Sequence, residues 1–195
     1  MTSTYLDRDD LIRVAADVAD RDGWHNLTMS SVAKEVDRHV TSLYGHVDGL
    51  DGLRREVQLL VFDELADALW RAALGRTRDD ALTALMDVYR EYLRVHRGRS
   101  VALGAASSID DPEVTKRGRR LIEPFYATFE SYGLDERSSV HAQRAISAAI
   151  RGFGITEASG RFGAEADESF AQLRLLFVTA LNDGNWPARN PPSPE

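Results

Sequence analysis

The chain has 195 residues, 43% hydrophobic and 28% charged, which suits a soluble globular protein with one large domain or a small domain beside a larger one. It has no cysteine, which excludes disulfides and thiolate metal sites, and no apolar run approaches the roughly 18 residues of a membrane span. The N-terminus is polar and acidic rather than a secretory signal, so we expect a cytoplasmic protein without a membrane partner. The net charge of −7 argues only weakly against a nucleic-acid partner, because only the docking face of such a protein must be positive.

The first elements along the chain are three helices of decreasing length. An amphipathic helix is predicted over residues 7–22 and is ended by Gly23. Thr28 is a good N-cap for a second, short helix, since its hydroxyl can accept from a free backbone amide. A turn over residues 37–39 separates it from a third helix over residues 40–47. The apolar stripe of the first helix is Leu11, Ile12, Ala15, Val18 and Ala19.

The rest of the chain also favours helices, because no alternating apolar run is bounded by hairpin turns. A long fourth helix follows Asp48, and Asp111 with Pro112 marks the start of the seventh. We therefore predict an all-α protein of about nine helices. The predicted domains are residues 1–47, residues 48–184 and a disordered, proline-rich tail over residues 185–195. The helices after the fourth are predicted near residues 79–96, 97–109, 112–132, 136–157 and 167–181.

The stretch "VTSLYGHV", residues 40–47, has one apolar face and one unusual face. In a helix Leu43 and Val47 lie four residues apart on the side that contacts a core. The opposite side carries small polar residues and one large aromatic, Tyr44, without a run of charges. Two short helices joined by about three residues, after a longer one, have the spacing of a helix-turn-helix whose second short helix enters the major groove of DNA.

Residues 27–53, "LTMSSVAKEVDRHVTSLYGHVDGLDGL", resemble the DNA-binding domain of the tetracycline-repressor (TetR) family. The matching features are Leu-Thr before the second helix, Ala33 within it, Ser-Leu-Tyr-x-His-Val at residues 42–47 and Leu53 in the fourth helix. The resemblance implies an N-terminal DNA reader and a larger helical domain that binds a small molecule and dimerises. It implies DNA contacts by nine residues: Thr28, Ser30, His39, Val40, Thr41, Ser42, Tyr44, Gly45 and His46.

Three departures from the family pattern weaken the expected DNA affinity. The turn glycine is replaced by Asp37, and the basic residue common at the start of the fourth helix is replaced by Leu50. Within residues 23–47 the bases Lys34 and Arg38 are balanced by two acids, so the formal charge is zero. We expect modest affinity per subunit, strengthened when two subunits bind together. Arg8, Arg13, Arg54 and Arg55 are candidates for additional phosphate contacts.

The C-terminal helices resemble the family's regulatory domain, in the form of an actinobacterial-type subgroup. Small residues near Gly152 and apolar residues in the last two helices predict a four-helix seam in a homodimer, although the same residues can simply pack within one chain. A symmetric dimer would present two recognition helices about one DNA turn apart, roughly 34–36 Å. The predicted dimer residues are Ile146, Ala149, Ile150, Phe153, Phe170, Leu173, Phe177 and Leu181.

A ligand pocket is predicted among the fourth, fifth, seventh and eighth helices. Its mixture of side chains indicates a small, mostly apolar effector with one or two polar groups, although aromatic residues at helical spacing are most often core residues. Gln143 is a further polar candidate. The predicted lining is Phe62, Leu85, Tyr89, Tyr92, Leu93, His96, Phe125, Tyr126, Phe129 and Arg151.

Two other classes of function stay open. An enzyme is disfavoured because the sequence has no nucleophile elbow, phosphate-binding loop, zinc-protease motif or dinucleotide fingerprint, and we expect neither a cofactor nor a metal. The second alternative is a helical ligand-binding or protein-interaction dimer that has lost DNA binding. It is suggested by Asp37, by Leu50 and by the zero formal charge of the predicted DNA-reading head, residues 23–47. The favoured interpretation is that the protein is a ligand-responsive repressor that binds a palindromic operator as a homodimer.

Overall fold

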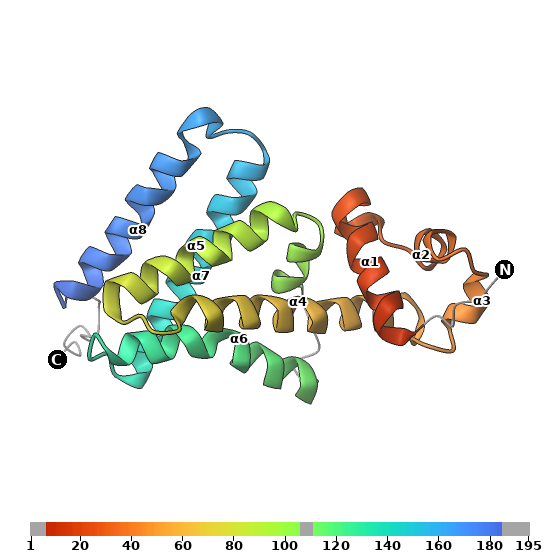
Figure 1. Ribbon diagram of the computed structural model, residues 1–195, viewed down its shortest axis with the longest axis horizontal. Helices are drawn as coiled ribbons and strands as arrows, with labels where there is room; N and C mark the ends of the chain where they lie inside the picture. Colours follow the sequence, from red (N-terminus) through yellow and green to blue (C-terminus); the bar gives the residue numbers. More distant parts are fainter. Residues whose placement is uncertain (1–6, 106–110, 185–195) are drawn as a thin grey trace, which may run out of the picture. The chain divides into compact units, whose positions relative to one another are not determined.

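The computed structural model describes residues 7–105 and 111–184, and these residues form α-helices and short 3-10 helices without a strand (Figure 1). The predicted all-α class is confirmed. The sixth predicted helix is the 3-10 helix η2; residues 106–110, at its predicted end, and the predicted tail 185–195 lie outside the described residues. The elements are α1 (Arg8–Asp22), η1 (Trp24–Asn26), α2 (Met29–Glu35), α3 (Val40–Leu43), α4 (Gly49–Ala73), α5 (Arg78–Val95), η2 (Arg99–Gly104), α6 (Pro112–Glu130), α7 (Glu136–Ala158), η3 (Gly163–Glu165) and α8 (Ala166–Asn182).

The chain divides into two compact units. Unit 1 contains the described residues up to Glu64 together with Val95–Arg119, and unit 2 contains Leu65–Arg94 and the described residues from Arg120 onward. Unit 1 therefore holds the first half of α4, all of η2 and the start of α6 in addition to the three N-terminal helices. The division between the two units falls within α4.

The core of unit 1 follows from the three- and four-residue spacing of apolar side chains on α1 and α2. Leu11, Ala15 and Val18 on α1 are fully buried, as are Leu27 before α2 and Val32 within it. The apolar positions of α4 in this unit join the same core. The first helix ends where predicted, because Gly23 adopts a φ of 94°, a conformation that side-chain-bearing residues rarely adopt.

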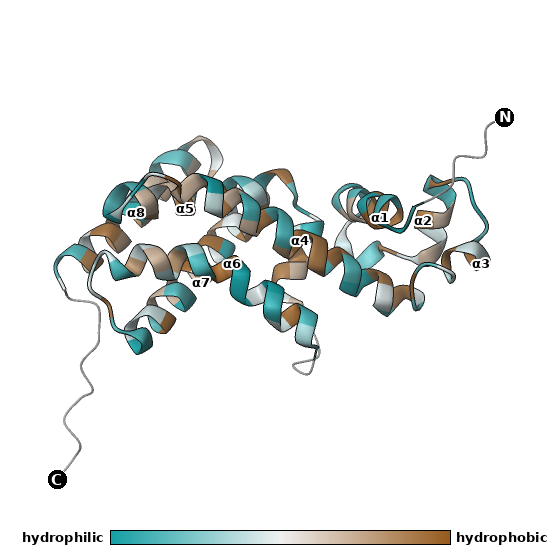
Figure 2. Ribbon diagram, turned by 60° about the horizontal axis from the view of Figure 1, so that its bottom comes forward, coloured by the Kyte–Doolittle hydropathy of each residue, from teal (hydrophilic) through white to brown (hydrophobic). Residues whose placement is uncertain are grey.

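The core of unit 2 is formed by apolar side chains of α5, α7, α8 and the parts of α4 and α6 that belong to this unit; Figure 2 shows both hydrophobic (brown) and hydrophilic (teal) positions on these helices. Arg90 on α5 joins two other helices: its Nε donates to Glu157 of α7 at 3.1 Å, and its Nη2 lies 2.8 Å from Asp167 of α8. The Arg90 guanidinium also lies over the ring of Phe170, 4.7 Å from its centroid. The fully buried side chains of unit 2 include Leu65, Leu69, Leu82, Leu85, Met86, Phe129, Ile146 and Ile150.

Candidate nucleic-acid interface

The N-terminus of α2 is capped as the sequence predicts. The Thr28 hydroxyl accepts from the backbone N–H of Ser31 at 3.0 Å, and the backbone N–H of Thr28 donates to the Ser31 hydroxyl at 3.1 Å. Thr28 and Ser30 are both exposed. A capped helix end with exposed hydroxyls beside free backbone amides is suited to contact a phosphate.

The recognition helix is shorter than predicted. Only Val40–Leu43 is α-helical, and residues 44–46 continue as a hydrogen-bonded turn in which the N–H of His46 donates to the carbonyl of Leu43 at 2.9 Å. Leu43 is fully buried and Val47 is 6% exposed, so the predicted inward face is confirmed. This single turn of helix is held on the core by those two side chains.

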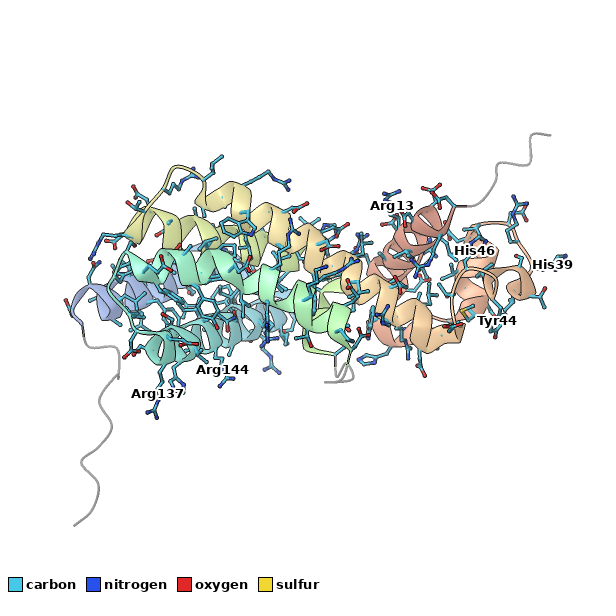
Figure 3. The ribbon with its side chains drawn as sticks, turned by 90° about the horizontal axis from the view of Figure 1, so that it is seen from below. Arg13, His39, Tyr44, His46, Arg137 and Arg144 are labelled. Carbon is cyan, nitrogen blue, oxygen red and sulfur yellow. The ribbon has the colours of Figure 1, made fainter. Side chains whose placement is uncertain are left out.

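The outward face of the same segment is open to solvent. Tyr44 is 57% exposed, which is high for a large aromatic side chain, and in Figure 3 both His39 and Tyr44 project away from the packed helices. Of the nine residues predicted to contact DNA, Val40 and His46 are half-buried and the other seven are exposed. The helix-turn-helix thus places all nine within unit 1, with most of their surface available to a partner.

The turn between α2 and α3 contains a residue in a strained backbone conformation. It lies at the position where the sequence departs from the family pattern. Asp37, where the family pattern has glycine, adopts a φ of 50°. That left-handed conformation is unfavourable for residues with a side chain, and aspartate tolerates it better than most. The turn therefore keeps the geometry of a glycine turn although the glycine is absent.

Two arginines hold the ends of the helix-turn-helix in place. Arg8 of α1 donates from Nε to the carbonyl of His46 at 3.2 Å, and it also forms an ion pair with Glu56 at 2.9 Å. Arg54 of α4 donates to the carbonyl of Leu27, just before α2, at 3.3 Å. These contacts give Arg8 and Arg54 positioning roles within unit 1 that the sequence did not suggest.

The other two arginines predicted as phosphate contacts differ in their surroundings. Arg13 is exposed and forms an ion pair with Asp10, three residues earlier on α1, at 3.1 Å. Arg55 forms a two-pronged ion pair with Asp111 at the start of α6 and also contacts Glu56. That arginine, assisted by the backbone amides of Val114 and Glu113, lowers the pKa of Asp111 to about 2. The Arg55 side chain is therefore engaged in ion pairs within unit 1.

A cavity of about 590 Å³ in unit 1 was not foreseen from the sequence. It lies beside η1, the first turns of α4 and the start of α6, and its lining includes Trp24, Arg54 and Gln58. The Nε of Arg54 is buried and has no hydrogen-bond partner among the described residues. No local sequence pattern indicates this cavity, because its walls come from segments far apart in the sequence: η1, α4, the end of η2 and the start of α6.

Most of the predicted effector-pocket residues lie in hydrophobic cores. Phe62 and His96 belong to unit 1, and the other eight belong to unit 2. Tyr89 is buried, and desolvation raises the pKa of its phenol to about 12 although the charge of Arg151 acts in the opposite direction. Tyr126 lines a separate hollow of about 400 Å³ with Glu130 and Glu136. The Nε2 of Gln143 donates to the Ser147 hydroxyl at 2.8 Å.

The predicted dimer residues divide by burial. Five of them pack inside unit 2 of the single chain, whereas Ala149, Phe153 and Leu173 are half-buried. Three apolar residues of α7 and α8 that were not among the predicted dimer residues are strongly exposed. They are Ile155 on α7 at 75%, and Leu175 and Leu176 on α8 at 57% and 63%. The three-to-four-residue spacing selected the inward stripe, as it does in any amphipathic helix. The five buried residues are Ile146, Ile150, Phe170, Phe177 and Leu181.

The outward face of α7 also carries charge. Arg137 and Arg144 are seven residues apart, so they share one face, and Figure 3 shows both pointing away from the helix bundle. Ile155 lies eleven residues further on the same face. No helix of the described residues is long and apolar enough to cross a membrane, and the described residues contain no group of acidic and histidine side chains that could hold a metal.

Comparison with known proteins identifies the class of this chain. Residues 82–176 match the family model described as the tetracyclin repressor-like C-terminal domain. The chain is 37% identical over 182 residues to an uncharacterized HTH-type transcriptional regulator of Mycobacterium tuberculosis, covering 90% of this chain and 82% of that protein. A second relative, an uncharacterized HTH-type regulator of Bacillus subtilis, is 25% identical, with 88% and 90% covered.

Solved structures share the fold at low identity. Apo ActR from Streptomyces coelicolor superposes with a TM-score of 0.70 at 16% identity, covering 96% of this chain and all of the other. A TetR variant from Acinetobacter baumannii in complex with minocycline gives 0.68 at 19% identity, with the same coverage. ActR in complex with (S)-DNPA gives 0.65 at 16% identity, covering 93% and 99%.

An all-α chain with an N-terminal helix-turn-helix and these relatives is an HTH-type transcriptional regulator. More particularly, the chain belongs to the TetR family, as the motif at residues 27–53 indicated.

Proposed function

We propose that this protein is an effector-responsive repressor that binds a palindromic DNA operator as a homodimer. The observation that carries the proposal is the exposure of Tyr44, 57% of whose surface is open on a recognition segment otherwise fixed by buried Leu43. Most of this large aromatic side chain on a small polar face is open to solvent. It is suited to contact a sugar-phosphate backbone or a base edge.

The roles within the reading face follow from position. Residues of the recognition segment, with Thr41, Tyr44 and Gly45 outermost, would approach base edges, and the small side chains would let the backbone come close to the groove floor. Thr28 at the capped end of α2 would bind a phosphate. Arg8 and Arg54 would hold the reading segments rather than touch DNA, because each donates to a backbone carbonyl of the head.

A second copy of the chain is the proposed partner of the exposed face of α7 and α8. Ile155, Leu175 and Leu176 would supply its apolar contact area, and Arg137 and Arg144 its charged rim. Two copies related by a twofold axis would present two reading heads to two half-sites. This arrangement also accounts for a head with zero formal charge, since two heads bind together more tightly than one.

The proposed effector is a small, mostly apolar molecule bound within the helical C-terminal domain. The solved complexes of a TetR variant with minocycline and of ActR with (S)-DNPA support a small-molecule site in this fold. Effector binding would shift α4, which runs from unit 1 into unit 2, and so change how well the heads match the operator. Couplings of this kind are typically about 1–3 kcal/mol, enough to release an operator at moderate protein concentration.

The test is selection of bound sequences from a random pool of DNA duplexes, at low and then at higher salt. We expect enrichment of a palindrome, and its half-site spacing would report the separation of the heads. Tyr44→Ala is the matched control, because it removes the exposed ring without touching the core. If the wild-type protein enriches no sequence at any salt, the alternative of a helical ligand-binding or protein-interaction dimer without DNA binding replaces this proposal.

A further inference from the structure

Arg99, the first residue of η2, lies at the centre of a charged cluster inside unit 1. Its side chain is buried, with 6% of the residue exposed, and it is surrounded by carboxylates from two helices. Its Nε donates to Asp20 of α1 at 2.7 Å, Nη2 contacts Asp17 of α1, and Nη1 lies 3.4 Å from Glu64 of α4. Burying a guanidinium is costly unless acceptors surround it, and here three carboxylates do so.

Asp20 receives more than this one ion pair. One of its oxygens accepts the backbone N–H groups of Gly98 at 3.0 Å and of Arg99 at 2.8 Å, and Nδ1 of His96 lies 3.0 Å from the other. The carboxylate of α1 therefore holds both the side chain and the backbone at the start of η2. Such hydrogen bonds to a charged acceptor are stronger than those between neutral groups.

Gly98 brings the two backbones into direct contact. A Cβ atom at this position would lie 1.7 Å from the carbonyl oxygen of Ala19 and 2.7 Å from the Cα of Asp20. Both are backbone atoms, so no side-chain rotation can make room. The φ of Gly98 is −82°, which any residue can adopt, so glycine is required here for space and not for backbone conformation.

The cluster lies where the chain passes between the two units. Glu64 is the last residue of α4 in unit 1, and Val95, four residues before Arg99, is where the chain returns to unit 1 from α5. Arg99 therefore ties both of these connections to α1, the helix on which α2 packs, and α3 in turn packs on α2. We infer that Arg99, seated by Gly98 against α1, is the positioning residue that fixes the direction of the reading head and thereby sets which half-site spacing the protein accepts.

This inference rests on the proposed function, because half-site spacing has meaning only for a dimer that reads DNA. Adding one base pair between half-sites moves one of them by about 3.4 Å and turns it by about 35° around the duplex axis. A head that is firmly fixed to α4 and η2 cannot follow such a change. A head released from the cluster can follow it, at the cost of weaker binding to the correct spacing.

The experiment compares Arg99→Met and Gly98→Ala with the control Arg97→Gln, using the selected operator and versions with one base pair added or removed. Arg97 is the adjacent exposed arginine, so its substitution removes the same charge without touching the cluster. We expect the wild-type preference for the correct spacing to fall at least about tenfold in both test variants, equivalent to about 1.4 kcal/mol. The control should keep its preference, and the salt dependence of binding should stay the same in all three.

Equal spacing preference in Arg99→Met and wild type, both folded, would overturn the inference while leaving the proposed function intact. A protein that binds no operator would defeat the proposed function instead. The part of the inference that does not depend on DNA, the fixing of the head by Arg99, is then tested by the distance distribution between spin labels at Ser30→Cys and Val101→Cys, both exposed positions in a chain that lacks native cysteine. Arg99→Met should broaden that distribution and Arg97→Gln should not; an unchanged width would overturn it. If Arg99→Met fails to fold, Asp17→Asn, which removes one exposed partner of Arg99, takes its place.

Discussion

Arg8 and His46 are 38 positions apart in the sequence, and the Nε of the first donates to the backbone carbonyl of the second at 3.2 Å. The bond joins the start of α1 to the end of the recognition segment. Because α3 is only four residues long, little within the helix itself fixes the direction of the following turn. The arginine on α1 supplies part of that constraint from outside.

Replacing Arg8 with alanine should therefore weaken operator binding through loss of positioning. We expect the affinity to fall by about three- to tenfold, in line with about 1 kcal/mol for a hydrogen bond made by a charged group at a half-exposed site. A positioning role leaves the slope of affinity against salt unchanged, whereas loss of a phosphate contact reduces that slope by about one. Arg13→Ala, which breaks an exposed pair with Asp10, is the control, and a reduced slope in Arg8→Ala would show that Arg8 itself binds phosphate.

Leu43 is buried in the core and its neighbour Tyr44 is exposed to solvent, so their alanine variants should have different defects: loss of stability for Leu43→Ala and loss of DNA binding for Tyr44→Ala. Tyr44→Ala should leave the free energy of unfolding within about 0.5 kcal/mol of wild type while weakening operator binding by about 1–3 kcal/mol. Leu43→Ala removes a fully buried side chain and should lower the free energy of unfolding by about 2–5 kcal/mol. Denaturant unfolding and DNA titration of both variants check this pair. A Tyr44→Ala protein that binds DNA like wild type would contradict the assigned reading face.

Asp37 holds a left-handed turn that glycine would adopt with less strain. Asp37→Gly should raise the free energy of unfolding, by up to about 1 kcal/mol, because relief of the strain exceeds the entropy that glycine loses on folding. Asp37→Val should lower it by about 1 kcal/mol or more, since a β-branched residue is especially unfavourable at positive φ. Thermal or urea unfolding measures both, and a glycine variant less stable than wild type would mean that the Asp37 side chain contributes an interaction of its own.

The sequence indicated the helical class and the reading face because both depend on local patterns. The spacing of Leu43 and Val47 determines which side of the segment faces the core, and the Thr28 cap is read from one residue and its neighbours. The Arg99 cluster could not be predicted in this way. Its members at residues 17, 20, 64 and 99 come together only after three segments pack, and in the sequence Arg99 cannot be distinguished from the nearby exposed Arg97.

The predicted dimer residues show what an apolar pattern in the sequence cannot determine. An apolar stripe at helical spacing marks the buried face of a helix, but it does not distinguish burial within the chain from burial against a second chain. Phe170 and Phe177 satisfy the pattern by packing inside unit 2, whereas Leu175 and Leu176 interrupt it and lie exposed. Exposed apolar residues that break the stripe are therefore the proposed subunit contact, and the predicted dimer residues remain untested in that role.

The pair of Arg55 and Asp111 should make the stability of the protein depend on pH in the acid range. The folded protein holds the pKa of Asp111 at about 2, below its ordinary value of 3.8, so the unfolded chain binds a proton more readily. The stabilisation is therefore complete above about pH 4 and is lost as the pH falls toward 2. Unfolding measured from pH 6 to pH 2 should show wild type more stable than Asp111→Asn at the upper end, with the difference shrinking below pH 4. A difference that stays constant with pH would assign the effect to the helix cap of α6 rather than to the ion pair.

The exposed leucines of α8 give the most direct test of the subunit interface. Changing Leu175 and Leu176 together to glutamate should convert the dimer to a folded monomer, because each buried leucine contributes about 1.5–3 kcal/mol and a buried carboxylate adds a further penalty. Leu74→Glu is the control, since that leucine is 81% exposed and lies just beyond the end of α4, on neither α7 nor α8. Sedimentation equilibrium measures the mass of each protein, and circular dichroism verifies its helix content. Phe177→Ala, by contrast, should lower the free energy of unfolding by about 3–5 kcal/mol, because its ring packs inside the single chain. If the double glutamate variant sediments as a dimer like wild type, the subunits meet elsewhere, and the exposed face of α8 has another partner.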